Sequence, residues 1–388
     1  MDIRYLTDAK LRPGVRVILR ADLDVGVKNG RVTDDMRIRA CLPTIQYLMR
    51  QDARIRIVGY RGRPGGIRDP RLTLAPVSRL LAKLLKKKVM FLEDPFNERT
   101  LRAYRDSRGI LFFENIRFWR EETHNDIAFA RALSSWGDCY VNDAFANAHR
   151  REASLVLVPT LLPAYAGLHL KEEITALENI ITHPKRPLVA VLGGAKIETK
   201  LPLMRRFLKD ADQVLVGGAL ANSIFSLMGR RVGKSRTDTD AHADVAIFKE
   251  RNLLLPSDAV VTRALAARAA HTTRDIRDVR PDEYIVDIGP ETRSRFSAAF
   301  HDASTVVWNG PLGMTEIAAY AEGTRAVARA IRRAPRAFSV VGGGDTISAL
   351  RRLRMLRGFD HVSTGGGAML SFLAGEEMPA LDALKRPV

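Results

Sequence analysis

Short apolar runs recur along the first half of the chain, separated by longer stretches of mixed composition. The runs cover residues 15–23, 54–59, 89–92, 110–113 and 139–141. Runs of this length without strict polar alternation are typical of strands that are buried on both faces, and the stretches between them are long enough for helices. The first half is therefore predicted to form a parallel sheet with helices on both faces.

A second series of apolar runs follows and predicts a second sheet of the same kind. Its members are residues 187–192, 213–216, 259–262, 284–288, 305–308, 338–341 and 361–362. The fold class is thus predicted as α/β, with two doubly wound, Rossmann-like parallel-sheet domains and a cleft between them.

The stretch at 171–182 predicts the helix that joins the two domains. Ile174, Leu177 and Ile181 are three and four residues apart, so they share one helical face. Prolines at 184 and 187 then end the helix.

A glycine-rich turn in the second half is the most informative motif. The apolar run at 338–341 leads into Gly342-Gly343-Gly344-Asp345-Thr346 and then into a helical stretch. Glycines let backbone N–H groups approach an anion at a helix N-terminus, and Asp345 supplies the single carboxylate that Mg²⁺ on nucleotide phosphates requires. Similar turns occur at 216–219, 307–313 and 361–368. Together they predict a nucleotide site at one edge of this domain.

Two known nucleotide-binding patterns are missing from the sequence. The stretch at 229–235 is one residue too short between its glycines for a Walker A loop, and there is no G-x-G-x-x-G fingerprint. The second pattern's absence argues against a dinucleotide oxidoreductase.

Lys196 and Lys200 follow a further glycine turn and are four residues apart. This spacing predicts that both lysines lie on one face of the first turns of a helix, where they can bind phosphoryl oxygens.

Arginines follow the predicted strands of the first half. Arg37, Arg63, Arg117 and Arg150 all lie in motifs at or just past strand ends. The carboxyl ends of parallel strands share one edge of a sheet, and the planar guanidinium binds carboxylate and phosphate groups in a bidentate manner. We expect these arginines to form a site for a small, doubly charged acid.

Composition and charge narrow the cellular setting and the partners. The chain has 388 residues and a formal net charge of +18, which indicates attraction to phosphorylated substrates or to nucleic acid. It contains only two cysteines, its N-terminus lacks an apolar signal core, and no apolar run approaches the ~20 residues of a membrane span. These features predict a cytoplasmic enzyme.

The ordered motifs resemble those of the phosphoglycerate kinase family, over roughly residues 15–384. The resemblance implies reversible phosphoryl transfer between 1,3-bisphosphoglycerate and Mg-ADP, which gives 3-phosphoglycerate and ATP, in a cytoplasmic monomer without a specific nucleic-acid or membrane partner. The motifs lie at residues 20–24, 34–38, 60–64, 114–118, 143–150, 193–200, 308–313, 342–346 and 363–368.

The resemblance also implies a role for each part of the chain. Residues 1–167 would bind the triose phosphate, 168–184 would form the hinge, 185–372 would bind the nucleotide, and 373–388 would pack back on the first domain. The residues that would stabilise the transferring group are Arg37, Lys196 and Lys200. Those for the triose substrate are Asp22, Leu23, Asp24, Arg37, Tyr60, Arg61, Gly62, Arg63, Arg117 and Arg150. Those for the nucleotide are Lys200, Gly217, Gly218, Asn309, Pro311, Glu316, Gly343, Gly344, Asp345, Thr346, Gly366 and Gly367, with Asp345 also binding Mg²⁺.

Some positions depart from the family pattern. Tyr60 stands where most members have His, and Asp24 where most have Asn, so a carboxylate replaces a neutral amide beside an anion site. Trp119, Asn147 and Glu152 likewise replace residues that are often His, Thr and His. An enzyme of the same chemistry on a different small acid is therefore an alternative, and a basic nucleic-acid-binding protein is a less favoured one.

Overall fold

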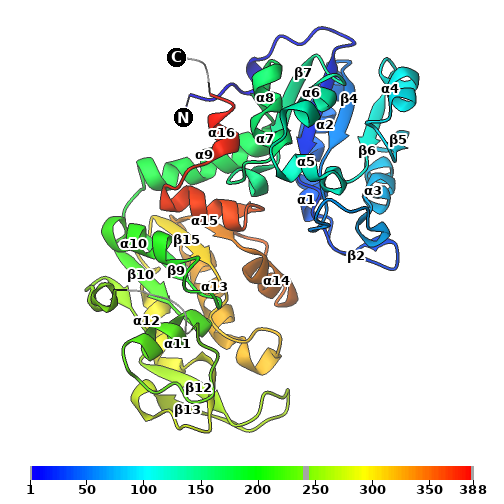
Figure 1. Ribbon diagram of the computed structural model, residues 1–388. Helices are drawn as coiled ribbons and strands as arrows, with labels where there is room; N and C mark the ends of the chain where they lie inside the picture. Colours follow the sequence, from blue (N-terminus) through cyan, green and yellow to red (C-terminus); the bar gives the residue numbers. More distant parts are fainter. Residues whose placement is uncertain (1, 239–243, 386–388) are drawn as a thin grey trace. The chain divides into compact units, whose positions relative to one another are not determined.

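The computed structural model describes residues 2–238 and 244–385 (Figure 1). The chain forms two compact units. The first consists of residues up to 175 together with the chain end from 377, and the second consists of residues 176–376.

The first unit is built on a six-stranded sheet in which every neighbouring pair is parallel. Its spatial order is β5-β6-β4-β1-β7-β8. Five of these strands confirm the predicted runs, and the short edge strand β8 was not predicted. The bounds are β1 (Arg16–Ala21), β4 (Arg54–Val58), β5 (Val89–Leu92), β6 (Ile110–Phe113), β7 (Cys139–Asp143) and β8 (Ala164–Ala166), and a separate hairpin pairs β2 (Val27–Lys28) with β3 (Arg31–Val32).

Helices cover both faces of this sheet because alternate strand residues point to opposite sides. Val17 and Leu19 of β1 pack with Ile45 and Val77 in one apolar cluster, whereas Arg20 points to the other face. The first face carries α1 (Met36–Ala40), α2 (Leu42–Arg50) and α3 (Ala75–Leu85). The remaining helices before the joint are α4 (Glu98–Tyr104), α5 (Arg120–Thr123), α6 (Ile127–Ser134), α7 (Ala153–Val156) and α8 (Val158–Leu161).

The second unit contains another six-stranded parallel sheet. Its spatial order is β11-β10-β9-β15-β16-β17. The bounds are β9 (Leu188–Leu192), β10 (Gln213–Val216), β11 (Leu253–Leu254), β15 (Thr305–Asn309), β16 (Phe338–Gly342) and β17 (His361–Ser363).

Two predicted strands of this unit do not belong to the parallel sheet. β12 (Asp258–Thr262) and β14 (Tyr284–Ile288) pair antiparallel with each other, and β13 (His271–Asp275) pairs antiparallel on the other side of β12. The prediction that all seven runs form one doubly wound sheet was therefore wrong in this part. An apolar run gives a strand's burial but not its direction.

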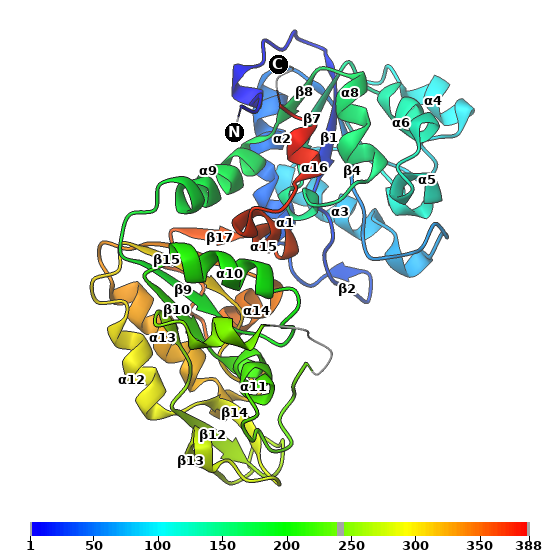
Figure 2. The same ribbon diagram turned by 60° about the vertical axis from the view of Figure 1, so that its left-hand side comes forward.

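Helices also cover both faces of the second parallel sheet. Val306 and Trp308 pack in one apolar cluster with Phe296, Val327 and Leu350, which come from α12 (Pro290–Ala298), α13 (Glu322–Arg333) and α14 (Gly344–Arg352). The other helices are α10 (Leu201–Asp210), α11 (Gly218–Leu227) and α15 (Gly367–Ala374), of which α10 and α15 pack side by side (Figure 2).

A single helix, α9 (Leu168–Thr182), leads from the first unit into the second. The chain end returns to the first unit through α16 (Pro379–Asp382), where Ala380 N–H donates to Ala148 O at 3.1 Å. None of the helices within the described ranges has the length and apolar composition of a membrane span.

Candidate functional site

The second parallel sheet reverses its strand order between β9 and β15. Numbered by chain order within the sheet it reads 3-2-1-4-5-6, and ligands of such sheets bind outside the carboxyl ends of the strands at the reversal. The turns after β9 and β15 touch here, since Gly193 N–H donates to Asn309 O at 2.8 Å. A Cβ on Gly193 would lie 2.2 Å from Pro311 O. Glycine at this position thus allows the two turns to meet at the switch point.

The turn after β16 joins the same edge and has the predicted order of strand, turn and helix. Gly343 caps α14 with a φ of 96°, a conformation that favours glycine. Thr346 Oγ1 accepts from Gly310 N–H at 2.7 Å, and Asn309 Nδ2 donates to Gly342 O at 3.1 Å. The first N–H groups of α14 are left for a ligand, which makes the turn suitable for phosphate.

Lys200 is the buried cation of this site. Its side chain is only 7% exposed, and its Nζ donates to Asn309 Oδ1. Burial lowers the pKa of Lys200 to about 8, while the carboxylate of Asp345 acts in the opposite direction. The predicted helical placement of the lysines was wrong, because Lys196 and Lys200 lie in a turn that precedes α10. Lys196 is exposed.

Two cavities adjoin this edge. The smaller, of about 280 Å³, is polar in character. The larger, of about 490 Å³, includes apolar side chains such as Phe225 and Leu312 in its wall and is large enough for a nucleobase and its sugar. The smaller cavity includes Lys196, which was predicted to stabilise the transferring group, and the predicted nucleotide residues Lys200, Asn309, Gly343, Gly344, Asp345 and Thr346. Those in the larger are Gly218, Pro311, Glu316 and Asp345.

Three of the predicted glycines line neither cavity, namely Gly217, Gly366 and Gly367. Conversely, Asp287 lies in the wall of the larger cavity although no sequence motif predicted it there. Burial raises the pKa of Asp287 to about 7, and its carboxylate accepts from Gly323 N–H at 2.8 Å. Its position at the end of an apolar strand was the only available signal.

Of the described residues in the wall of the smaller cavity, Asp345 is the one with a carboxylate. The described residues contain no group of three or more potential metal ligands. One exposed carboxylate in a glycine-rich turn at a helix N-terminus fits Mg²⁺ that is held mainly by nucleotide phosphates and water.

The first unit gathers charged residues at the end of β1. Asp22 is 2% exposed and accepts from Arg37 Nη1 at 3.2 Å, and Arg37 also donates to Asp24 O at 3.2 Å. Burial raises the pKa of Asp22, although the charge of Arg37 acts against this. Arg37 remains 30% exposed and can still reach a ligand.

The turn after β4 is held from both sides. Gly62 N–H donates to the carboxylate of Asp24 at 2.9 Å, and Gly62 O accepts from Arg117 Nη1 at 3.0 Å. Arg61 is buried and donates to two backbone carbonyls, those of Val25 and Thr73. Arg63, next in the chain, is exposed. Of the two arginines in this turn, Arg63 is therefore the one available to a ligand.

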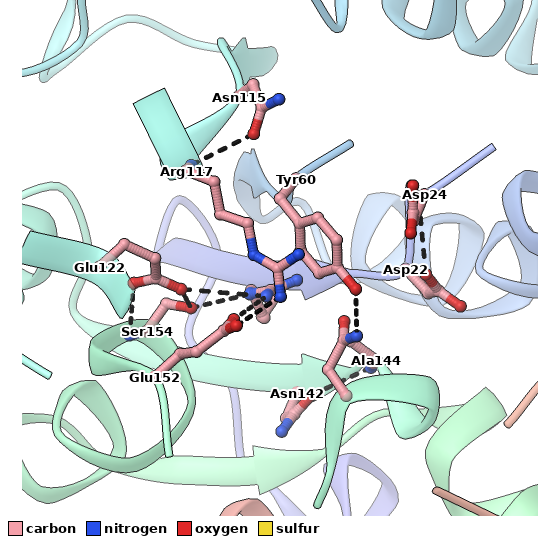
Figure 3. Close-up of polar contacts among 12 residues, drawn as sticks. Asp22, Asp24, Tyr60, Asn115, Arg117, Glu122, Asn142, Ala144, Glu152 and Ser154 are labelled. Atoms are coloured by element: carbon pink, nitrogen blue, oxygen red, sulfur yellow. Dashed lines mark hydrogen bonds and ion pairs between the residues drawn. The ribbon is translucent and has the colours of Figure 1, made fainter. Parts of the chain in front are cut away.

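Tyr60 stacks under an arginine (Figure 3). The guanidinium carbon of Arg117 lies 3.3 Å from the centre of the Tyr60 ring, and the Tyr60 hydroxyl accepts from Asn147 Nδ2 at 2.6 Å. Burial raises the pKa of Tyr60.

Leu23 is 1% exposed, whereas Arg150 is half-buried and its Nε has no hydrogen-bond partner within the described part of the chain.

A buried network of two arginines and two glutamates lies beside Tyr60 (Figure 3). Glu152 pairs with Arg117 Nη2 and lies 3.6 Å from Arg20 Nη2. Arg20 Nε donates to Ser154 Oγ at 2.8 Å, and Ser154 donates to Glu122. Burial raises the pKa of Glu122 to about 7. Arg117, at 4% exposure, thus has its charge satisfied inside the unit.

The chain matches the family model described as phosphoglycerate kinase over residues 6–376. It belongs to the phosphoglycerate kinase family. Among relatives, it is 41% identical to phosphoglycerate kinase of Dictyoglomus turgidum, covering 98% of each chain. It is 42% identical to that of Rubrobacter xylanophilus, over 99% of this chain and 98% of the relative.

Solved structures of the phosphoglycerate kinase family agree with the fold. The enzyme from Coxiella burnetii superposes with a TM-score of 0.86 at 37% identity, and the match covers 98% of both chains. The enzyme from Pyrococcus horikoshii gives a TM-score of 0.85 at 32% identity with the same coverage. Family membership makes the chain a kinase, a phosphotransferase of glycolysis.

Proposed function

We propose that the chain catalyses reversible transfer of the acyl phosphate of 1,3-bisphosphoglycerate to ADP, which yields 3-phosphoglycerate and ATP. The observation that carries the proposal is the polar cavity at the switch point, where Lys200 and the α14 N-terminus meet. Phosphoryl transfer needs positioning and positive charge more than a base, and this cavity supplies both.

The nucleotide belongs to the second unit in this proposal. Its phosphates bind the turn at 342–346, its base enters the larger cavity, and Glu316, in the wall of that cavity, accepts hydrogen bonds from the ribose. The further nucleotide contacts are proposed at Gly218, Asn309 and Pro311. Gly217, Gly366 and Gly367 are proposed to support the binding turns from behind, since neither cavity includes them.

We propose Asp345 as the protein ligand of Mg²⁺. When bound, the ion neutralises charge on the nucleotide phosphates. Asp345 orients this assembly through one carboxylate, and its distance from the buried Lys200 is short enough to affect the lysine's pKa.

The triose acid belongs to the first unit. Arg37, Arg63 and Arg150 are proposed as direct ligands of its carboxylate and phosphate, because all three retain exposed surface. Asp22, Leu23, Asp24, Tyr60, Arg61, Gly62 and Arg117 are proposed to shape the site, since the contacts above hold them in place. Arg37, Lys196 and Lys200 stabilise the transferring group through their positive charge.

A coupled assay with 3-phosphoglycerate and Mg-ATP tests the proposal. Turnover that saturates in both substrates is the expected result, and omission of Mg²⁺ abolishes it. Failure to turn over at millimolar concentrations of both substrates would reject the proposal. The interdomain cleft expected from the sequence stays a prediction.

A second candidate is the same reaction on a different small acid. Tyr60, Asp24 and the Glu152–Arg117 pair favour it, because two carboxylates and a phenol stand where the family pattern has neutral or imidazole side chains. Other phosphorylated and carboxylic acids can be compared as phosphoryl acceptors. A kcat/KM at least tenfold higher for one of them than for 3-phosphoglycerate would favour this candidate.

We also propose a cytoplasmic monomer that binds no specific nucleic acid. The two cysteines are buried and not bonded to each other, as expected in a reducing compartment. Size-exclusion chromatography, cell fractionation and filter binding across a salt series test the three statements separately.

A further inference from the structure

Among the described residues that line both cavities of the second unit, Arg236 is the only one with a cationic side chain. It borders the smaller cavity together with Lys196 and Lys200, and the larger one together with Phe225 and Leu312. Neither the glycine turns nor the lysine motif includes it, so its position depends on the fold alone.

Side chains on both sides of Arg236 in the chain are hydrogen-bonded to other segments of the unit. Ser235 Oγ accepts from Ile285 N–H at 2.7 Å, which fixes the preceding residue to β14. Asp238 Oδ2 accepts from Ile197 N–H at 3.2 Å, inside the turn that carries the two lysines. Arg236 is therefore held at the boundary between the two cavities.

Within residues 2–238 and 244–385, the guanidinium of Arg236 has no ion-pair or hydrogen-bond partner. It is exposed, whereas Lys200 is engaged with Asn309. A diphosphate carries more negative charge than one buried lysine can neutralise. The planar guanidinium of an arginine can donate two parallel hydrogen bonds to phosphate oxygens.

We propose that Arg236 binds the phosphate chain of the nucleotide, as a third cation beside Lys196 and Lys200. This inference rests on the proposed nucleotide site. Arg236 spans the junction of the base and phosphate cavities, so it contacts the phosphates nearest the sugar. It contributes to affinity for the phosphorylated nucleotide and not to affinity for the nucleoside.

Calorimetric titration of the whole chain with ADP and with adenosine tests this. Arg236→Gln is expected to raise the Kd for ADP about tenfold or more, because a charge-assisted hydrogen bond is lost, and to change the Kd for adenosine less than twofold. The matched control is Arg231→Gln, at an exposed arginine that borders neither cavity, which should leave both constants unchanged.

Kinetics provide a second measurement on the same variants. Arg236→Gln should raise KM for ATP and leave KM for 3-phosphoglycerate unchanged. An unaltered ADP affinity, or an equal loss for adenosine and ADP, would overturn the inference while the wild-type chain still binds ADP. If the wild-type chain binds no ADP, the result rejects the proposed function, and the inference about Arg236 is rejected with it.

Discussion

The first unit and the second both hold cations near the carboxyl ends of parallel strands, but they hold them differently. Arg20 and Arg117 are buried and paired with Glu122 and Glu152. Lys200 is also buried, but its hydrogen-bond partner is the neutral amide of Asn309, and it lines the smaller cavity.

The difference distinguishes cations whose charge is neutralised inside the fold from a cation whose charge is left for the proposed ligand. A buried arginine between two carboxylates has little charge left to offer, and removal of one partner leaves an uncompensated charge. Burial removes water from around Lys200 and therefore lowers its pKa, and the neutral amide beside it supplies no negative charge in return. Under the proposed function, the phosphate oxygens of the nucleotide supply the negative charge that the second site lacks.

The largest expected effect comes from removing the buried lysine. Lys200→Met keeps the length of the side chain and removes its charge, so kcat/KM should fall by about 10² to 10³. The control is Lys209→Met, at an exposed position in α10. A loss smaller than fivefold in the coupled assay would contradict the role of Lys200.

The next effect concerns the paired cations. Glu152→Gln leaves Arg20 and Arg117 with one carboxylate fewer, so the free energy of unfolding should fall by about 3 kcal/mol. Urea denaturation measures this change. The control is Glu121→Gln, at an exposed position, whose free energy of unfolding should stay within about 0.5 kcal/mol of the wild-type value. Equal stability of both variants would show that the network is not structural.

Nucleotide affinity should depend on pH through Lys200. Its pKa of about 8 means that the free enzyme loses this charge as the pH rises, so the Kd for ADP should increase between pH 7 and pH 9. The increase should be about tenfold if only the charged form binds. Lys200→Arg, which stays charged, should remove the dependence. A wild-type Kd that does not change over this range would contradict the expectation.

A smaller effect should appear in stability against pH. The pKa of Glu122 is about 7 in the folded chain and about 4.5 in the unfolded one, so the folded state holds the proton more tightly. Stability from this group is therefore greatest at low pH and is lost as the pH rises toward 7. Glu122→Gln should reduce the fall in unfolding free energy between pH 5 and pH 7 by about 2 kcal/mol. Asp143 and Asp287 remain in both proteins, so parallel thermal melts isolate Glu122.

The smallest effect is expected at Asp24. Asparagine would keep the acceptor for Gly62 N–H and remove one negative charge, so KM for 3-phosphoglycerate should fall about two- to threefold. Burial lowers the pKa of Arg61 while the carboxylate of Asp24 opposes this, so Arg61 already offsets part of the charge. A rise in KM would instead indicate that the carboxylate itself organises the turn.

Local patterns predicted the strands and glycine turns well, and long-range pairing poorly. The apolar pattern did not predict the antiparallel sheet, because β13 is largely exposed and contains no apolar run. Arg20 and Ser154 are 134 positions apart in the sequence, so the residues next to either one in the chain do not predict their hydrogen bond. Tyr60 and Asn147 were noted as departures from a pattern, but their mutual contact was not foreseen.

The sequence by itself determined the two parallel sheets, the glycine-rich turn at 342–346 and the family, because these depend on short runs of residues and on the steric freedom of glycine. Only the tertiary structure decided which cations are neutralised. Arg117 and Arg37 look alike in the sequence, yet one is stacked and paired and the other is partly exposed. A side chain's available charge depends on its neighbours in space, and those come from distant parts of the chain.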